Sequence, residues 1–201
     1  LLSIIPTLGH AISAPAAHVR YVGPLFSRTR RDSRERALLE RIHELPRPRV
    51  FLSLGTTYGP GLLENCLQAL SGFDGSLIAS GCGETRLGSR AVGAPFFHDV
   101  DAVIQASDAV VTVCGGKTVM DSLKHGAPMV GLPRQGEQRD IALALADQGT
   151  AILPCLRKWD GAAFRSATSP KILIGISRTT SPRSAACRRP SSRAPPRTSP
   201  R

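Results

Sequence analysis

Short apolar runs of strand length alternate along the chain with longer segments in which apolar residues recur at helical spacing. The runs are separated by glycine, proline and small polar residues, which are typical of turns. Strands that alternate with helices in this way indicate parallel βαβ units. The pattern therefore predicts an α/β fold with a Rossmann-like, doubly wound parallel sheet. We expect strands at 50–54, 76–80, 96–97, 109–114 and 129–132, and helices at 26–45, 62–70, 101–106, 118–125 and 137–147.

The alternation is lost at both ends of the chain. Residues 1–24 are rich in Pro, Ala and Gly, which is typical of a linker. Residues 156–201 are dominated by Ser, Arg, Pro, Ala and Thr, so they cannot bury enough apolar surface to offset the entropy lost on ordering. We therefore predict a linker at 1–24, which would be a remnant of a missing amino-terminal domain. One folded domain would follow at 25–155, and then a disordered, low-complexity basic tail.

The strongest local motif places a strand, a glycine turn and a helix start in direct succession. The run Ala109–Val113 is β-branched, Gly115 and Gly116 permit a tight turn, and helical spacing begins at Thr118. Free N–H groups at the start of a helix, together with the positive end of its dipole, attract an anion. Lys117 adds a point charge that suits phosphate. The motif predicts a phosphate pocket.

A residue that could bind a sugar lies close to this pocket. Asp121 is one turn inside the predicted helix, where its carboxylate could accept hydrogen bonds from sugar hydroxyls. By itself the position would better suit an ordinary exposed carboxylate, and the surrounding motif favours ribose binding instead. Ligands of doubly wound sheets bind beyond the carboxyl ends of the strands, where Thr56, the glycine turn and residues 133–138 would converge. A phosphate beside a ribose-like diol indicates a nucleotide.

The same residues resemble the donor-binding signature of nucleotide-sugar glycosyltransferases with the two-domain GT-B fold. The resemblance rests on the sequence TVCGGKTVMD at Thr112–Asp121, then on Gly126–Pro128 and on Pro133–Gln138. It extends over roughly 19–154 and includes the lead-in HVRYVGPLF, the strand and loop VFLSLGTTYG, the helix EQRDIALALADQG and the closing AILP. Several motifs in family order and spacing make this a fairly specific signal.

The resemblance implies a function and a set of site residues. The chain would bind a UDP-sugar for hexosyl transfer to an acceptor hydroxyl, with the catalytic base in another domain and with neither a cofactor nor an obligatory metal. Asp121 would bind the ribose, and Glu137 and Gln138 would contact the donor sugar, although this pair could instead cap the helix that it opens. The diphosphate would be held by Thr56, Cys114, Gly115, Gly116, Lys117 and Thr118.

The chain departs from the family pattern at two positions. Many members have a histidine that touches the diphosphate where this chain has Val113, so contact there must come from the backbone. The acid at the ribose position is often glutamate, and Asp121 is one methylene shorter.

The length of the chain limits what it would do alone. A complete enzyme of this family needs two domains, whereas this chain has 201 residues and begins at Leu1. We therefore expect the carboxyl-terminal half of a glycosyltransferase, inactive without an acceptor-binding domain. The alternative is a non-catalytic donor-binding subunit of a split glycosyltransferase. No run approaches the ~20 apolar residues of a spanning helix, so we expect a cytoplasmic chain that would reach a membrane only through a partner.

The charge of the chain favours a further alternative. The formal net charge is +11, but residues 156–201 hold eleven Lys or Arg and one acid, which accounts for +10 of it. The tail could therefore bind nucleic acid or an anionic membrane surface without sequence specificity. Its aromatic residues, Trp159 and Phe164, are not interleaved with the later arginines, so it lacks a stacking platform.

Two other site chemistries fit the sequence less well. Gly116-Lys117-Thr118 resembles the end of a P-loop, but the glycine that a P-loop needs five residues before Gly116 is Val111. The five cysteines are scattered without metal-type spacing, and their odd number argues against a complete disulfide framework. We expect reduced thiols and no metal site.

Overall fold

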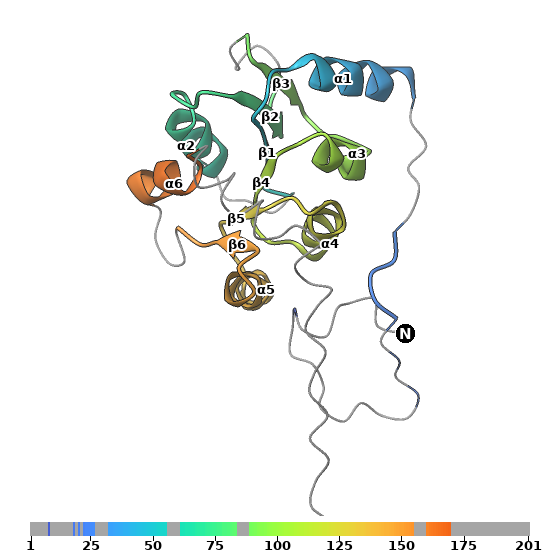
Figure 1. Ribbon diagram of the computed structural model, residues 1–201, viewed down its shortest axis with the longest axis vertical. Helices are drawn as coiled ribbons and strands as arrows, with labels where there is room; N and C mark the ends of the chain where they lie inside the picture. Colours follow the sequence, from blue (N-terminus) through green and yellow to red (C-terminus); the bar gives the residue numbers. More distant parts are fainter. Residues whose placement is uncertain are drawn as a thin grey trace, which may run out of the picture.

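The computed structural model describes residues 8, 18, 20, 22–26, 32–55, 61–83, 89–154 and 160–169. A parallel sheet with the strand order β3-β2-β1-β4-β5-β6 forms its centre (Figure 1). This arrangement confirms the predicted Rossmann-like α/β fold. The strand order reverses between β1 and β4, which is where such sheets open a ligand crevice beyond their carboxyl ends. The strands are β1 (Arg49–Ser53), β2 (Ser76–Ser80), β3 (Ala91–Ala94), β4 (Ala109–Thr112), β5 (Met129–Gly131) and β6 (Ala151–Ile152).

Helices cover both faces of the sheet. One face carries α1, α3, α4 and α5, whose apolar residues share a core cluster, and the other carries α2 and α6. Figure 1 shows α2 and α6 on one side of the strands and α1, α3 and α4 on the other. None of the helices in the described ranges is long and apolar enough to cross a membrane. The helices are α1 (Ser33–Glu44), α2 (Leu62–Ala69), α3 (Val100–Gln105), α4 (Gly116–His125), α5 (Gly136–Asp147) and α6 (Gly161–Ala167).

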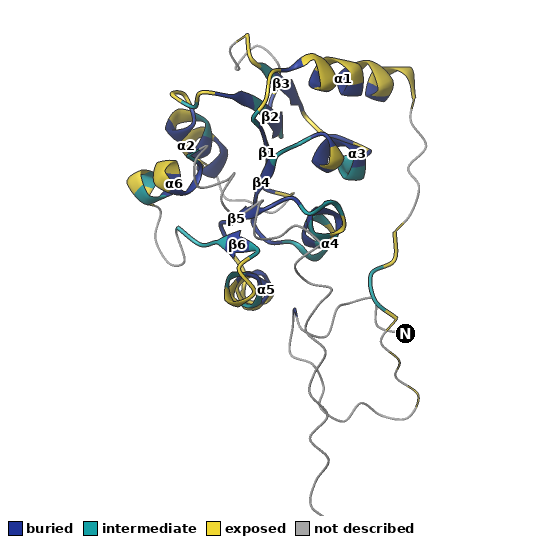
Figure 2. Cartoon of the chain, viewed as in Figure 1, coloured by how far each residue is buried: buried dark blue, intermediate teal, exposed yellow. Residues whose placement is uncertain are grey.

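Successive residues of the strands point alternately into two apolar cores, one on each face of the sheet. Phe51 and Val110 pack in the cluster beneath α1, α3, α4 and α5, whereas Val50, Leu52 and Val111 pack in the cluster beneath α2 and α6. Strands that are buried on both faces read as continuous hydrophobic runs, as these do. Figure 2 shows the sheet largely buried, with exposed residues on the outer surfaces of the helices.

The third strand lies earlier in the chain than predicted. It spans Ala91–Ala94, whereas the sequence pattern placed it at 96–97. The ring of Phe97 is fully buried and meets Phe51 edge-on, with 5.8 Å between the ring centroids. The hydrophobicity of Phe97 therefore serves the core and not a strand.

The first helix is shorter than predicted. The pattern placed it at 26–45, but it begins at Ser33, because the Asp32 side chain accepts a hydrogen bond of 2.8 Å from the backbone N–H of Glu35 and caps the helix. Phe26 is exposed and lies outside any helix. The other predicted helices and strands agree with the structure to within two residues, whereas β6 and α6 were not predicted.

Regular structure continues beyond the point where the sequence pattern fades. We predicted that the tail begins at 156, yet α6 spans Gly161–Ala167, and its cap Asp160 accepts hydrogen bonds from Ala162 N and Ala163 N at 2.9 and 3.0 Å. Phe164 is fully buried in the core beneath α2. One aromatic anchor and one cap thus add a helix to the domain despite the polar composition. Residues 170–201 lie outside the described residues.

Buried polar groups satisfy one another at the amino-terminal edge of the sheet. The Arg49 guanidinium donates from Nε to Leu45 O at 2.7 Å, from Nη2 to His43 O at 2.6 Å and from Nη1 to Ala106 O at 3.4 Å. It therefore joins the carboxyl-terminal ends of α1 and α3, whose negative dipole ends favour a cation. Burial lowers the pKa of Arg49, and repulsion by Arg47 acts in the same direction.

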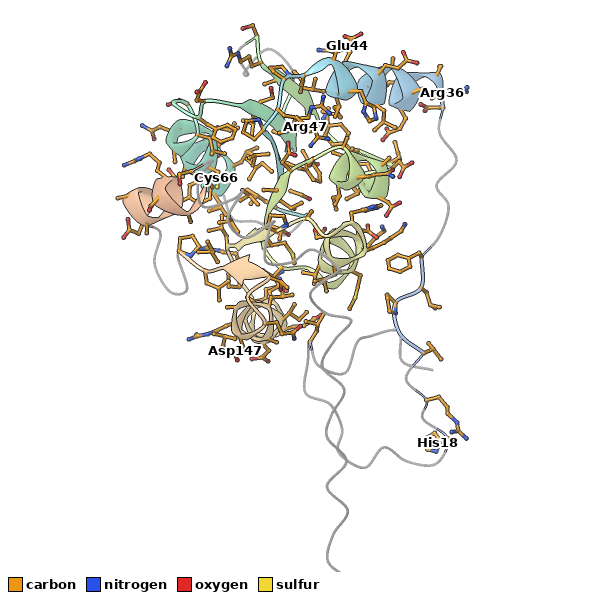
Figure 3. All side chains as sticks on the ribbon, in the orientation of Figure 1. His18, Arg36, Glu44, Arg47, Cys66 and Asp147 are labelled. Atoms are coloured by element: carbon orange, nitrogen blue, oxygen red, sulfur yellow. The ribbon has the colours of Figure 1, made fainter. Side chains whose placement is uncertain are left out.

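The carboxylate of Asp108 completes this network. It accepts a hydrogen bond of 2.8 Å from Arg49 N and forms an ion pair with Arg47, which lies just before β1 (Figure 3). Ser76, the first residue of β2, donates from its hydroxyl to Pro46 O at 2.7 Å. This edge is a closed structural network.

Candidate functional site

The junction between β4 and α4 lies at the opposite, carboxyl-terminal edge of the sheet. Gly115 is the N-cap of α4 and has extended backbone angles, with φ −66° and ψ 138°. No side chain caps the helix, and its first turn contains no acidic residue. The positive end of α4 is therefore left without a compensating protein group in its first turn, which is the geometry of an anion site.

Cys114 sets the direction of the chain at this junction. Its φ of +63° is in the left-handed region that residues with a side chain seldom adopt. The side chain is fully buried, Cys114 N donates to Thr112 Oγ1 at 3.2 Å, and burial raises the pKa of the thiol to about 12. Because the thiol points into the core, the predicted role of Cys114 in diphosphate binding would have to come from its backbone.

The Cys114 thiol fits against a glycine of the neighbouring strand. A Cβ at Gly131 would lie 2.8 Å from Cys114 Sγ and 2.6 Å from Leu153 Cδ2, so a side chain at Gly131 would displace the thiol. The β4–α4 turn and β5 are thus packed as one unit.

Lys117 and Asp121 pair with each other on α4. Lys117 Nζ lies 2.6 Å from Asp121 Oδ2, and the two residues are one helical turn apart. The side chain of Asp121 is 4% exposed, whereas that of Lys117 is 72% exposed. The predicted ribose ligand is therefore a buried carboxylate under a solvated lysine.

A cavity of about 290 Å³ adjoins this pair. The predicted residues Gly116, Lys117, Asp121 and Glu137 line it together with apolar side chains of α4 and α5. The volume is at the lower end of the range for small-molecule sites, which also combine apolar walls with a few polar groups.

The amino-terminal segment contributes a wall to this cavity that was not predicted from the sequence. Leu8, Pro24, Leu25 and Phe26 line it, although we assigned most of this segment to a linker. The apolar end of the lead-in HVRYVGPLF was the available signal, because Leu25 and Phe26 are large hydrophobic residues beside a predicted linker.

Glu137 and Gln138 occupy different places at the start of α5. Glu137 is exposed and lines the cavity. Gln138 is buried, and its Oε1 accepts hydrogen bonds from Arg134 N at 2.9 Å and from Gln135 N at 3.2 Å, as one half of a capping box with Gln135. Gln138 thus shapes the loop that leads into α5, and contact with a donor sugar stays a prediction for both residues.

The remaining predicted site residues are placed as follows. Thr118 is in the first turn of α4 and is partly buried, with its carbonyl accepting from Ser122 Oγ at 2.7 Å. Thr56 lies outside the described residues.

Val113 is buried in the core beneath α2 and α6. Val111 is a central residue of β4, so the P-loop alternative is wrong, because its first glycine would fall inside a buried strand.

Two histidines that could suggest catalysis have structural partners. His125 Nε2 lies 2.8 Å from Asp101 Oδ1, and Lys124 Nζ lies 2.8 Å from the same oxygen, so these contacts tie α3 to the end of α4. Burial disfavours the ionised form of Asp101, but the hydrogen bonds from Lys124 and His125 hold the pKa of Asp101 below its usual value. The ring of His98 packs edge-on against Phe96.

The described residues contain no cluster of three or more His, Cys, Asp or Glu side chains that could hold a metal ion. Cys66, Cys82 and Cys114 are buried and are not joined by disulfide bonds, and Cys66 is labelled on α2 in Figure 3. Cys155 and Cys187 lie outside the described residues. A second cavity, of about 700 Å³, lies between α2 and α6 and is lined by Asn65, Asp74 and Arg165 among others, away from the α4 site.

Comparison with known proteins identifies relatives of the chain. Residues 77–155 match the Glycosyltransferase family 28 C-terminal domain. The chain is 32% identical to a demethyllactenocin mycarosyltransferase of Streptomyces fradiae over 144 residues, which is 66% of this chain and 31% of that protein. It is 30% identical to a zeaxanthin glucosyltransferase of Pantoea ananas over 51% of this chain and 26% of that protein. The chain therefore spans about a quarter to a third of the length of these relatives.

Solved glycosyltransferase structures have the same fold. The structure of LpCGTa in complex with UDP matches this chain with a TM-score of 0.68 at 19% sequence identity. The match covers 89% of this chain and 48% of that one. The structure of glycosyltransferase VinC in complex with dTDP has a TM-score of 0.60 at 17% identity, over 87% of this chain and 45% of that one. The matched family domain contains the β4–α4 junction and the cavity residues of α4 and α5. Over these residues the chain is similar to the glycosyltransferase family 28 carboxyl-terminal domains.

Proposed function

We propose that this chain is the donor-binding half of a GT-B glycosyltransferase and binds a UDP-sugar beside α4. The observation that carries the proposal is the uncapped start of α4, which faces the same cavity as Lys117 and Asp121. A helix start that can bind an anion would suit the diphosphate, and a carboxylate one turn further along would suit the ribose attached to it. The names of the relatives, a mycarosyltransferase and a glucosyltransferase, support a sugar nucleotide as the ligand.

The site would assist transfer by holding the leaving group. In the reaction an acceptor hydroxyl attacks the anomeric carbon of the donor, and the bond from that carbon to the diphosphate oxygen breaks. The electron pair of that bond leaves with the diphosphate, while a base outside this domain takes the hydroxyl proton. N–H groups of Gly115–Thr118 and the Lys117 ammonium would stabilise the developing negative charge. This function requires no metal.

An acceptor-binding domain or subunit is the partner that this proposal requires. The chain spans 31% and 26% of the lengths of the two relatives named above, and the proposal places the base and the acceptor site outside the described domain. The isolated chain would bind a donor without turning it over.

Calorimetric titration of the full chain tests the donor-binding function. We expect UDP, UDP-glucose and UDP-N-acetylglucosamine to bind more tightly than ATP, with TDP-glucose as a comparison for the base and sugar. Asp121→Ala should abolish this preference, and EDTA should leave binding unchanged. Equal binding of every polyanion, with release by added salt, would instead favour electrostatic attraction by the basic tail.

A further inference from the structure

Lys117 occupies a position that is unfavourable for a cation. It lies in the first turn of α4, where the positive end of the helix dipole repels positive charge, and that turn contains no acidic residue to compensate. Asp121, one turn further along the helix, supplies the compensation through the 2.6 Å contact from Lys117 Nζ to Asp121 Oδ2. A lysine at this point stabilises the helix poorly, which indicates a role toward a ligand.

The same contact occupies Asp121, the carboxylate that is predicted to accept hydrogen bonds from the ribose. Asp121 Oδ2 already accepts from Lys117, and the Asp121 side chain is 4% exposed. A sugar hydroxyl that reaches this largely buried carboxylate would therefore compete with the lysine for Oδ2 unless the lysine moves. The Lys117 side chain, which is 72% exposed and flexible, can make that movement.

The charges around the cavity show what would draw the lysine away. Among the described residues that line the cavity, Lys117 is the sole basic side chain, whereas Asp121 and Glu137 are acidic. A diphosphate that binds at the start of α4 brings more negative charge than one carboxylate, and it meets Lys117 at the helix end. Charge-assisted hydrogen bonds to phosphate then compete with the pair to Asp121.

We propose that Lys117 is an exchangeable partner of Asp121, a role that rests on the proposed donor-binding function. In the free chain Lys117 neutralises Asp121. When a nucleoside diphosphate binds, Lys117 Nζ moves to a phosphate oxygen and releases Asp121 Oδ2, which then accepts a hydrogen bond from a ribose hydroxyl. The diphosphate thereby enables recognition of the ribose, and the site selects intact nucleoside diphosphates against both free nucleosides and inorganic pyrophosphate.

The exchange predicts opposite effects on two halves of the ligand. In Lys117→Met, uridine should bind about threefold to fivefold more tightly than in the parent chain, because Asp121 no longer has a partially exposed ion pair to lose. The same change should weaken UDP and pyrophosphate by roughly tenfold, because a charge-assisted contact to phosphate is lost. In Asp121→Asn, pyrophosphate should bind at least as tightly as in the parent chain, because Lys117 is then free, whereas uridine should bind more weakly.

The experiment is a titration of the full chain and its variants with uridine, UDP and pyrophosphate, followed by ligand-observed NMR for the weak nucleoside. Arg139→Met is the matched control, because Arg139 is an exposed cation on α5 that does not line the cavity. It removes one positive charge and should leave uridine affinity unchanged. Thermal unfolding of each variant establishes that the folded fraction is equal.

The outcomes separate this inference from the donor-binding function. If the parent chain binds UDP but Lys117→Met leaves uridine affinity unchanged or lowers it, Lys117 is a fixed phosphate contact and the exchange is wrong. If the parent chain binds neither UDP nor pyrophosphate, both the donor-binding function and the exchange are overturned. A gain for uridine together with a loss for pyrophosphate supports the exchange.

Discussion

At the amino-terminal edge of the sheet, buried polar groups are satisfied by other protein groups, whereas at the carboxyl-terminal edge a helix start is left without a cap. The Arg49 guanidinium donates to three backbone carbonyls, and Asp108 holds both Arg49 N and Arg47. At the other edge, α4 begins at Gly116 without a capping side chain, and a cavity lies beside it. The first edge stabilises the fold, and the second has polar groups available for a ligand.

The largest expected effect comes from breaking the network at the amino-terminal edge. Arg49→Met should lower the free energy of unfolding by about 3 kcal/mol, because carbonyls at the ends of α1 and α3 lose a buried charged donor. Urea unfolding measures this loss. Arg36→Met, at an exposed residue of α1 (Figure 3), is the control and should change stability little. UDP affinity of the folded Arg49→Met protein should match the parent, and a marked loss would mean that the edges are not separate in function.

A methyl group at Gly131 should damage both stability and the site. Gly131→Ala forces a Cβ within 2.8 Å of Cys114 Sγ, and overpacking of this kind costs about 1–3 kcal/mol. Because Cys114 directs the chain into α4, UDP affinity should fall as well. Gly136→Ala is the control, since a Cβ at Gly136 meets no atom within 4 Å. Unfolding and UDP titration measure the two effects, and an unchanged affinity in Gly131→Ala would show that Cys114 packing does not shape the site.

The buried Cys114 thiol predicts a loss of stability in alkali. Its pKa is about 12 in the folded chain, so the unfolded chain releases this proton first, above the ordinary thiol pKa of about 8.5. The stabilising contribution is complete below about pH 8.5 and is lost progressively as pH rises toward 12. At pH 9 the loss should be about 1 kcal/mol from this group. Cys114→Ala should flatten the dependence relative to the parent chain, and parallel curves in urea unfolding from pH 7 to 9.5 would contradict this account.

The smallest expected effect is at the contact between α3 and α4. The pKa of Asp101 is lowered, so its contribution to stability is present above the unfolded pKa of about 3.9 and is lost as pH falls through the lower folded value. Asp101→Asn should cost about 0.5 kcal/mol at pH 7, because the ion pairs are partly exposed. The difference between the variant and the parent should shrink in acid. A constant difference from pH 7 to pH 3 would contradict the assignment.

Features that are local in the sequence could be predicted. The β4–α4 junction follows from an apolar run, two glycines and a helical period within about fifteen residues. The pairing of Lys117 with Asp121 is also local, because residues four apart lie on the same side of a helix. We predicted both residues as ligand contacts and did not consider that they would contact each other.

Features that depend on distant parts of the chain could not be predicted. Arg49 contacts Ala106, which is 57 residues away, and the fit of Cys114 against Gly131 depends on how β4 and β5 lie together. The helix α6 was missed because its composition resembles the tail, and its single buried aromatic residue, Phe164, has no period. In each case tertiary packing, and not local propensity, decides the outcome.

The most direct test of the contrast between the two edges is a titration of the full chain with UDP, followed through the backbone amide resonances. We predict saturable shifts at Gly115, Gly116, Lys117 and Thr118, and unchanged resonances at Arg49 and Asp108. Saturable shifts at the amino-terminal edge or at the cavity between α2 and α6, with none at the start of α4, would contradict the account.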